Sequence, residues 1–114
     1  MGIEIRQYDI LYVDLEVSNN LKGAGGEMIK LRPCVVISPD EMNRYLTTIV
    51  VAPMTSRSRL FPTRVRVRHN KKTVWIVVDQ LRTVDRTRIL KKLDRLTNPE
   101  IWRLKKVIRE TYVD

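Results

Sequence analysis

The chain has few of the residues on which common catalytic mechanisms depend. Its 114 residues include one histidine, His69, and one cysteine, Cys34. A single histidine excludes, within one chain, acid–base catalysis by a histidine pair, and we expect His69 to be exposed and idle. A single cysteine excludes an intrachain disulfide. Because Cys34 lies in an apolar run, we interpret it as a small buried hydrophobe and not as a nucleophile.

The sequence also lacks the patterns that are typical of metal sites, cofactor sites and membrane segments. No histidine and cysteine cluster has the spacing of a zinc site, no phosphate-cradling glycine loop precedes a helix, and the aspartates are scattered. We therefore expect no metal and no cofactor. Charged residues interrupt residues 1–17, so we expect neither a signal peptide nor a membrane span, and a cytoplasmic location.

Acidic residues are few beside basic ones. Asp and Glu total 13 while Lys and Arg total 22, which gives a formal net charge of +9. The length is that of one domain, which we place at residues 1–114. The excess of positive charge favours an anionic partner, and nucleic acid comes first among the candidates.

The chain does contain a series of short strand patterns. We predict strands at residues 8–17, 32–38, 46–52, 63–68 and 73–79, with a weaker one at 88–93. Pro53 is expected to stop the third strand, and residues 40–44 to form one helical turn. Residues 18–27 and 54–62 are predicted loops, the first of them rich in glycine. The pattern indicates a mainly β fold, built as a small antiparallel β-barrel.

One clear helix pattern follows at the C-terminus. Asn98 is a candidate cap, Pro99 suits the first helical position, and Glu100 favours the positive end of the helix dipole. Four large side chains then share one face at helical spacing: Ile101, Leu104, Ile108 and Tyr112. We expect this C-terminal α-helix to serve packing and not ligand binding.

The second predicted strand places one charged residue at the edge of the core. Pro33 forces Arg32 into an extended backbone, and the apolar residues 34–37 fit a strand that is covered on both faces. A guanidinium held this firmly suits phosphate binding. The alternative interpretation is an ordinary arginine at a strand end.

A basic stretch covers residues 57–72. It holds no acidic residue and seven cations: Arg57, Arg59, Arg64, Arg66, Arg68, Lys71 and Lys72. The alternation within residues 63–68 places three of the arginines on one face of a strand. This face is either an electrostatic track for a phosphate backbone or a solvated surface, and the net charge favours the track.

Polar residues end two of the apolar runs. Thr55 and Ser56 follow the third predicted strand, where their hydroxyls either serve chemistry or cap the turn. Asp79 closes the fifth run, where burial would raise its pKa unless Arg32 or Arg82 stood close to it. The plainer interpretation of Asp79 is a carboxylate tied to backbone amides.

Three motifs appear in order along the chain. They are Arg-Pro-Cys-Val-Val-Ile-Ser at residues 32–38, Val-Ala-Pro-Met-Thr-Ser at 51–56, and Asp-Gln-Leu-Arg-Thr-Val-Asp at 79–85. Together they resemble the MazF/PemK (Kid-like) toxins, and the likeness runs over nearly the whole chain. The resemblance implies an SH3-like (PemK/CcdB-type) barrel, a homodimer, and a metal-independent, sequence-specific endoribonuclease that acts on single-stranded RNA. It also implies neutralisation by a MazE-like antitoxin protein.

Matched by position, the resemblance implies that Arg32 and Thr55 are catalytic and that Asp79 is a base. The residues implied in RNA binding are Glu27, Lys30, Ser56, Gln80 and Arg82. The loops at 18–27 and 54–62 are expected to frame the RNA groove. One departure concerns Asp79, because Kid-like toxins carry an arginine two residues before this aspartate and Val77 stands there in this chain.

Two other functions stay open on the sequence alone. CcdB-like toxins share the barrel and poison DNA gyrase by binding, but they end in Trp-Gly-Ile, whereas this chain ends in Tyr-Val-Asp. A non-catalytic RNA-binding module would use the basic face alone. Loss of toxicity on changing Arg32 and Thr55, with RNA affinity kept, would separate the enzyme from such a module.

Overall fold

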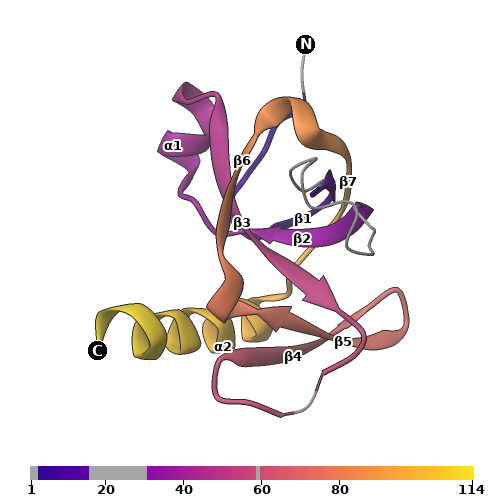
Figure 1. The fold of residues 1–114 in the computed structure, drawn as a ribbon, viewed down its shortest axis with the longest axis vertical. Coiled ribbons are helices and arrows are strands. Elements are labelled where there is room, and N and C mark those ends of the chain that lie inside the picture. Colours follow the sequence, from indigo (N-terminus) through magenta and orange to yellow (C-terminus); the bar gives the residue numbers. More distant parts are fainter. Residues whose placement is uncertain (1–2, 16–30, 59) are drawn as a thin grey trace, which may run out of the picture.

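The computed structural model describes residues 3–15, 31–58 and 60–114. Its strands and helices form a mainly β molecule with a helix at the C-terminus, as the sequence predicts (Figure 1). The strands are β1 (Asp9–Asp14), β2 (Leu31–Val36), β3 (Thr48–Thr55), β4 (Arg64–His69), β5 (Lys72–Val77), β6 (Arg82–Asp85) and β7 (Ile89–Arg95). The α-helices are α1 (Asp40–Tyr45) and α2 (Asn98–Ile108), and the short helical turns are η2 (Val78–Gln80), η3 (Arg86–Arg88) and η4 (Arg109–Val113).

The strands form one curled antiparallel sheet in which β3 joins the parts. The order is β4-β5-β3-β2-β1-β7, and β6 pairs with β3 as well. Along β3, Thr48 to Val51 pair with β6, Val51 to Pro53 with β2, and Met54 and Thr55 with β5. Pro53 lacks an N–H and stands where the partner changes. The strand continues through it, so the prediction that Pro53 ends this strand is wrong.

The chain between β5 and β6 leaves the sheet. Both strands pair with successive parts of β3, and η2 connects them. β6 is not among the predicted strands. Its four residues lie between two helical turns, and so short a segment shows no clear period.

Two hydrophobic clusters lie on opposite faces of the central strands. Val35 of β2 joins one cluster, whereas its neighbours Cys34 and Val36 join the other. The residues of β1 and β3 alternate between the clusters in the same way. The prediction that β2 is covered on both faces is therefore confirmed, and double burial explains its continuous apolar run.

The helix α2 covers one of these clusters and lies against β4 (Figure 1). Leu104 lies on the covered face of this helix and is fully buried. Three partly buried residues of the helix pack beside it: Ile101, Val107 and Ile108. The cap is Thr97 and not Asn98, because the Thr97 hydroxyl accepts the N–H of Glu100 while the Glu100 carboxylate accepts the N–H of Thr97. This reciprocal capping box fixes where the helix begins.

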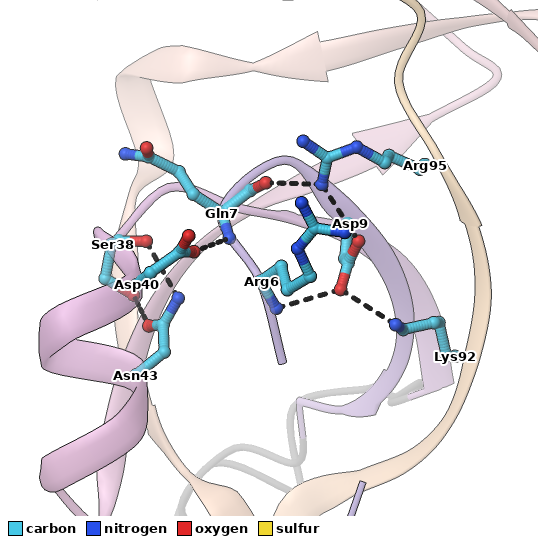
Figure 2. A network of polar contacts seen from close by, with 8 residues as sticks. All are labelled: Arg6, Gln7, Asp9, Ser38, Asp40, Asn43, Lys92 and Arg95. Carbon is cyan, nitrogen blue, oxygen red and sulfur yellow. Dashed lines mark hydrogen bonds and ion pairs between the residues drawn. The ribbon is translucent and has the colours of Figure 1, made fainter. Parts of the chain in front are cut away.

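Buried polar residues tie β1 to β7 and α1 to the chain after β2 (Figure 2). Asp9 is only 2% exposed, and its carboxylate contacts Lys92 Nζ and Arg95 Nη1, each at 3.2 Å. Asn43 of α1 is buried too, and its side chain donates to the Ser38 carbonyl at 2.9 Å and accepts from the Ser38 hydroxyl. Because these groups are paired, we assign the network a structural role.

Two sequence-level expectations concern the N-terminal part of the chain. The glycine-rich loop predicted at 18–27 and the end of the first predicted strand lie outside the described residues. Within the ranges that the structure describes, no helix is both long and apolar enough to cross a membrane.

Candidate active site

A hollow of about 510 Å³ opens where β2, β3 and η2 meet. Its described lining residues are Leu15, Arg32, Pro53, Met54, Thr55, Arg64, Val77, Gln80, Leu81 and Arg82. Three of them are arginines and none is acidic, so positive charge converges on a partly apolar floor. Such a surface suits an anionic ligand that also carries apolar groups.

Arg32 stands on β2 directly before Pro33, with an exposed side chain. Its Nη1 donates to the carbonyl oxygen of Met54 at 3.4 Å. This contact links the guanidinium of β2 to the carbonyl of the residue before Thr55, near the end of β3. A hydrogen bond of that length is weak, so the guanidinium is available to a stronger acceptor such as a phosphate oxygen.

Thr55 is the last residue of β3 and is half-buried. Its hydroxyl accepts the N–H of Arg57 at 3.1 Å and donates to the Arg57 carbonyl oxygen at 3.3 Å. The hydroxyl therefore caps the turn after β3, as the plainer interpretation of the sequence has it, and Thr55 also lines the hollow. To donate to a bound phosphate, the hydroxyl must turn its one proton away from the Arg57 carbonyl oxygen, and it can still accept the N–H of Arg57.

The residues that the family resemblance implies in RNA binding fall into three groups. Gln80 and Arg82 are exposed and line the hollow. Ser56 is exposed in the turn after β3 and is not among the lining residues. Glu27 and Lys30 lie outside the described residues.

Asp79 stands in η2 and does not line the hollow. Its Oδ1 accepts the Nε–H of Arg64 and the hydroxyl of Thr63, both at 2.9 Å. The hydrogen bond from Arg64 is the main reason that the pKa of Asp79 is lowered, against an opposing contribution from desolvation, and the bond from Thr63 lowers it further. The cation that contacts Asp79 is Arg64, and it lowers the pKa of the carboxyl as Arg32 or Arg82 would have done had either stood close to it.

Arg64 is the residue of this hollow that sequence reasoning missed as a site residue. It opens β4, and antiparallel pairing sets it opposite Val77 of β5. Val77 occupies the position at which Kid-like toxins have an arginine. In this chain a guanidinium reaches Asp79 from the facing strand instead, through an ion pair with a 2.9 Å separation.

A second hollow, of about 710 Å³, is lined by β4, β5 and α2. Its described lining residues are Arg64, Val65, Arg66, Val67, Arg68, Thr73, Glu100, Arg103 and Val107. Glu100 is the acidic member of this set, and the backbone N–H groups of Thr97 and Arg68 engage its carboxylate. Arg64 lines both hollows, so the basic surface is continuous between them. Because these cations gather in a groove, the basic stretch is better interpreted as an electrostatic track for a phosphate backbone than as a merely solvated surface.

The histidine and the cysteine line neither hollow. Cys34 is fully buried, and burial raises its pKa to about 12 against the opposing charges of Arg82 and Arg32. His69 is half-buried and not exposed as predicted, and its Nδ1 is buried without a hydrogen-bond partner among the described residues. Of the His, Cys, Asp and Glu residues that the structure describes, no three come together as a metal site.

The first hollow can hold a phosphate between a guanidinium and a hydroxyl. Arg32 brings positive charge and N–H donors, and Thr55 brings a hydroxyl from the end of the adjacent strand. Donors fixed in this way stabilise the negative charge that develops on phosphate oxygens during an in-line displacement. The arrangement therefore suits phosphoryl transfer on a nucleic-acid strand.

Comparison with known proteins points in the same direction. The family described as PemK-like, MazF-like toxin of type II toxin–antitoxin system matches residues 6–112 of the chain. Over 103 residues, the chain is 31% identical to an endoribonuclease MazF of Staphylococcus saprophyticus, and this match covers 85% of the chain and 82% of that protein.

Solved structures share the fold. A crystal structure of MazF from Deinococcus radiodurans matches with a TM-score of 0.77 at 19% identity, over 96% of this chain and 97% of that one. An endoribonuclease from a mycobacterial species, solved in complex with its cognate antitoxin, matches with a TM-score of 0.76 at 16% identity, over 93% of this chain and 92% of that one. These likenesses confirm the expected fold class.

Proposed function

The chain belongs to the PemK-like, MazF-like toxin family of type II toxin–antitoxin systems, and from this premise we propose how it acts. Membership of the family and the 31% identical relative support endoribonuclease activity. We propose, beyond that, that the enzyme cuts single-stranded RNA at short specific sequences, and that it needs no metal ion because the RNA supplies its own nucleophile.

In the proposed reaction, the 2′-hydroxyl beside the scissile bond attacks the phosphorus. The bond from O2′ to phosphorus forms while the bond from phosphorus to O5′ breaks, which leaves a 2′,3′-cyclic phosphate and a free 5′-hydroxyl. A base removes the proton of the 2′-hydroxyl, and O5′ gains a proton as it leaves. Arg32 neutralises charge on the non-bridging oxygens, and Thr55 donates a hydrogen bond that keeps the phosphate in line.

One observation carries this proposal: Arg32 and Thr55, which come from different strands, line the same hollow. The Arg32 guanidinium donates to the carbonyl of Met54, the residue next to Thr55. Had the two side chains lain on opposite sides of the barrel, they could not act on one phosphate. The family resemblance implies Asp79 as the base, but Asp79 does not line the hollow, so the remaining candidate for the base is Arg32 itself.

The RNA strand is proposed to continue from the first hollow into the second. Arg66, Arg68 and Arg103 line this second hollow, and we propose that they contact successive phosphates. Gln80 and Arg82, at the edge of the first hollow, are proposed to contact the RNA near the cut. Base choice depends on such contacts to splayed single-stranded bases.

The proposed partners follow from the family. We propose that the 1–114 chain forms one toxin domain, that two copies form a homodimer, and that a MazE-like antitoxin neutralises it in the bacterial cytoplasm. A solved structure of the same fold holds an endoribonuclease together with its cognate antitoxin, which supports the antitoxin as a partner. The family match favours this reading over gyrase poisoning and over a non-catalytic RNA-binding module.

The experiment that tests the proposal is cleavage of a long RNA by the purified protein in excess EDTA. We expect cuts at one recurring short sequence, with 2′,3′-cyclic phosphate or 3′-phosphate ends that chemical mapping identifies. The variant Arg32→Ala should lose the activity. Arg44→Ala is the matched control, because Arg44 is exposed on α1 and lines neither hollow.

Two results would contradict the proposal. One is cleavage that appears only when a divalent metal is added and that leaves 3′-hydroxyl ends. The other is full activity of Arg32→Ala. Gyrase inhibition in a relaxation assay, with RNA left intact, would establish the CcdB-like alternative instead.

A further inference from the structure

Arg64 lies where the two hollows meet, and it lines both of them. Its side chain is only 18% exposed, although it carries a full charge at the surface of the site. A charged side chain so far withdrawn from water needs compensating partners. The arrangement of those partners indicates what the residue does.

Contacts from three segments fix the orientation of the Arg64 guanidinium. Its Nε donates to Asp79 Oδ1 at 2.9 Å, and its Nη1 donates to the Ser58 hydroxyl at 2.8 Å. The ring of Phe61 lies beside it, with the guanidinium carbon 5.4 Å from the ring centre. These contacts use the Nε–H and one N–H of Nη1. The other N–H groups of the guanidinium can donate to an anion that enters the hollows.

Asp79 contacts this guanidinium without lining either hollow itself. Its Oδ1 also accepts the Thr63 hydroxyl at 2.9 Å, so the carboxylate is held from two sides. The hydrogen bond from Arg64 lowers the pKa of Asp79, which makes the carboxylate a weak proton acceptor at neutral pH. The position of Asp79 and its low basicity both favour a role in orienting Arg64 over a role in taking a proton from RNA.

We infer that Arg64 binds the phosphate next to the scissile one, at the junction of the two hollows, and that Asp79 is a positioning residue that holds the Arg64 guanidinium. This inference rests on the proposed function and assigns the two residues their parts in it. Arg64 binds its phosphate equally in the ground state and the transition state, because that phosphate does not react. Its loss should therefore raise KM and leave kcat nearly unchanged.

Steady-state cleavage of a short RNA that contains the mapped cut site tests this inference. Arg64→Ala should raise KM by about tenfold to about 100-fold, as expected for loss of a charge-assisted hydrogen bond, with kcat changed by less than about threefold. Asp79→Ala should raise KM by less. Asp79→Asn should behave almost like the parent protein, because the amide oxygen still accepts the Nε–H and the Thr63 hydroxyl.

A truncation series of the RNA makes the assignment sharper. In RNAs shortened from the 5′ side or the 3′ side of the cut, removal of the phosphate that Arg64 binds should abolish the effect of Arg64→Ala. The double variant Arg64→Ala/Asp79→Ala should be no worse than Arg64→Ala, because the two residues act as one unit. Arg44→Ala again serves as the control, and thermal unfolding of each variant shows whether it is folded.

The outcomes separate this inference from the proposed function. Equal losses of kcat in Asp79→Ala and Asp79→Asn, with KM unchanged, would make Asp79 the base and overturn the inference. Parent-like KM and kcat in a folded Arg64→Ala would overturn it as well. In both cases the proposed function stands if Arg32→Ala is inactive, and it fails if Arg32→Ala cuts RNA normally.

Discussion

At the scale of single residues, the proposed chemistry depends on where two ordinary side chains are held. Pro33 restricts the backbone at Arg32, and the bond to the Met54 carbonyl holds its guanidinium in the hollow that Thr55 also lines. The catalytic effect would come from charge and hydrogen-bond donors that are already in place when the phosphate becomes more negative.

The first prediction concerns the groups that Arg32 and Thr55 contribute. Arg32→Ala should lower the rate of cleavage by about 100-fold to about 1,000-fold, as loss of an oxyanion donor does elsewhere. Arg32→Lys should recover little of this, because an ammonium lacks the planar fork. Thr55→Val removes the hydroxyl at nearly constant volume and should also be slow, whereas Thr55→Ser should stay active. Single-turnover kinetics check these rates, and a Thr55→Val variant as fast as Thr55→Ser would contradict the role of the hydroxyl.

Arg32, Thr55 and Asp79 could be nominated from local motifs, but the contact between Arg64 and Asp79 could not, because it crosses a hairpin. The register was nevertheless present in the sequence. Asn70 and Lys71 both have positive φ and form the two-residue turn between β4 and β5, which sets residue 64 opposite residue 77. Counting back from that turn places an arginine across from Val77.

A second prediction concerns Cys34, whose burial raises its pKa to about 12 from an ordinary value of 9.0. A raised pKa keeps the thiol protonated, and hence unreactive, as pH rises through the ordinary value. A thiol-specific reagent should therefore label the folded protein very slowly at neutral and mildly alkaline pH, and label it at once in denaturant. Rapid labelling of the folded protein would show that Cys34 is accessible.

At the scale of elements, the sequence predicted the strands that alternate or run apolar and missed the places where pairing partners change. β3 passes through Pro53 because it needs no N–H for a ladder there, so a residue that usually ends a strand instead marks a change of partner. The turn η2, which connects β5 to β6, contributes Gln80 to the wall of the first hollow. Such features depend on long-range pairing, which local patterns do not encode.

A third prediction separates the two candidate caps of α2. Because the Thr97 hydroxyl accepts the Glu100 N–H, Thr97→Ala should lower the free energy of unfolding by about 1 kcal/mol. Asn98→Ala should change it by less than about 0.5 kcal/mol, since Asn98 is already a helical residue. Urea unfolding of both variants measures the difference. A larger loss for Asn98→Ala than for Thr97→Ala would restore Asn98 as the cap.

At the scale of the whole molecule, a net charge of +9 gathers in part around two adjoining hollows. Composition alone predicted an anionic partner. It could not show that Arg103 of α2 lines the same groove as Arg66 and Arg68 of β4, because only the packing of α2 beside β4 brings them together. The distribution of charge is therefore a property of the fold as much as of the sequence.

A fourth prediction follows from this distribution of charge. Binding of an uncleavable RNA should weaken steeply with salt, because each phosphate contact releases counterions. If Arg66 and Arg68 each contact one phosphate, Arg66→Ala/Arg68→Ala should reduce the slope of log affinity against log salt by about 1.4. Fluorescence anisotropy measures the slope, and Arg44→Ala should leave it unchanged. An unaltered slope in the double variant would mean that Arg66 and Arg68 of β4 do not contact the RNA phosphates.

The central claim is that RNA supplies its own nucleophile to a phosphate held by Arg32 and Thr55. It is tested most directly with an RNA in which the single ribose at the mapped cut site is replaced by 2′-deoxyribose, incubated with the protein in excess EDTA. The deoxy substrate should bind and stay intact, while the all-ribose strand is cut. Cleavage of the deoxy substrate at the same bond would contradict the mechanism.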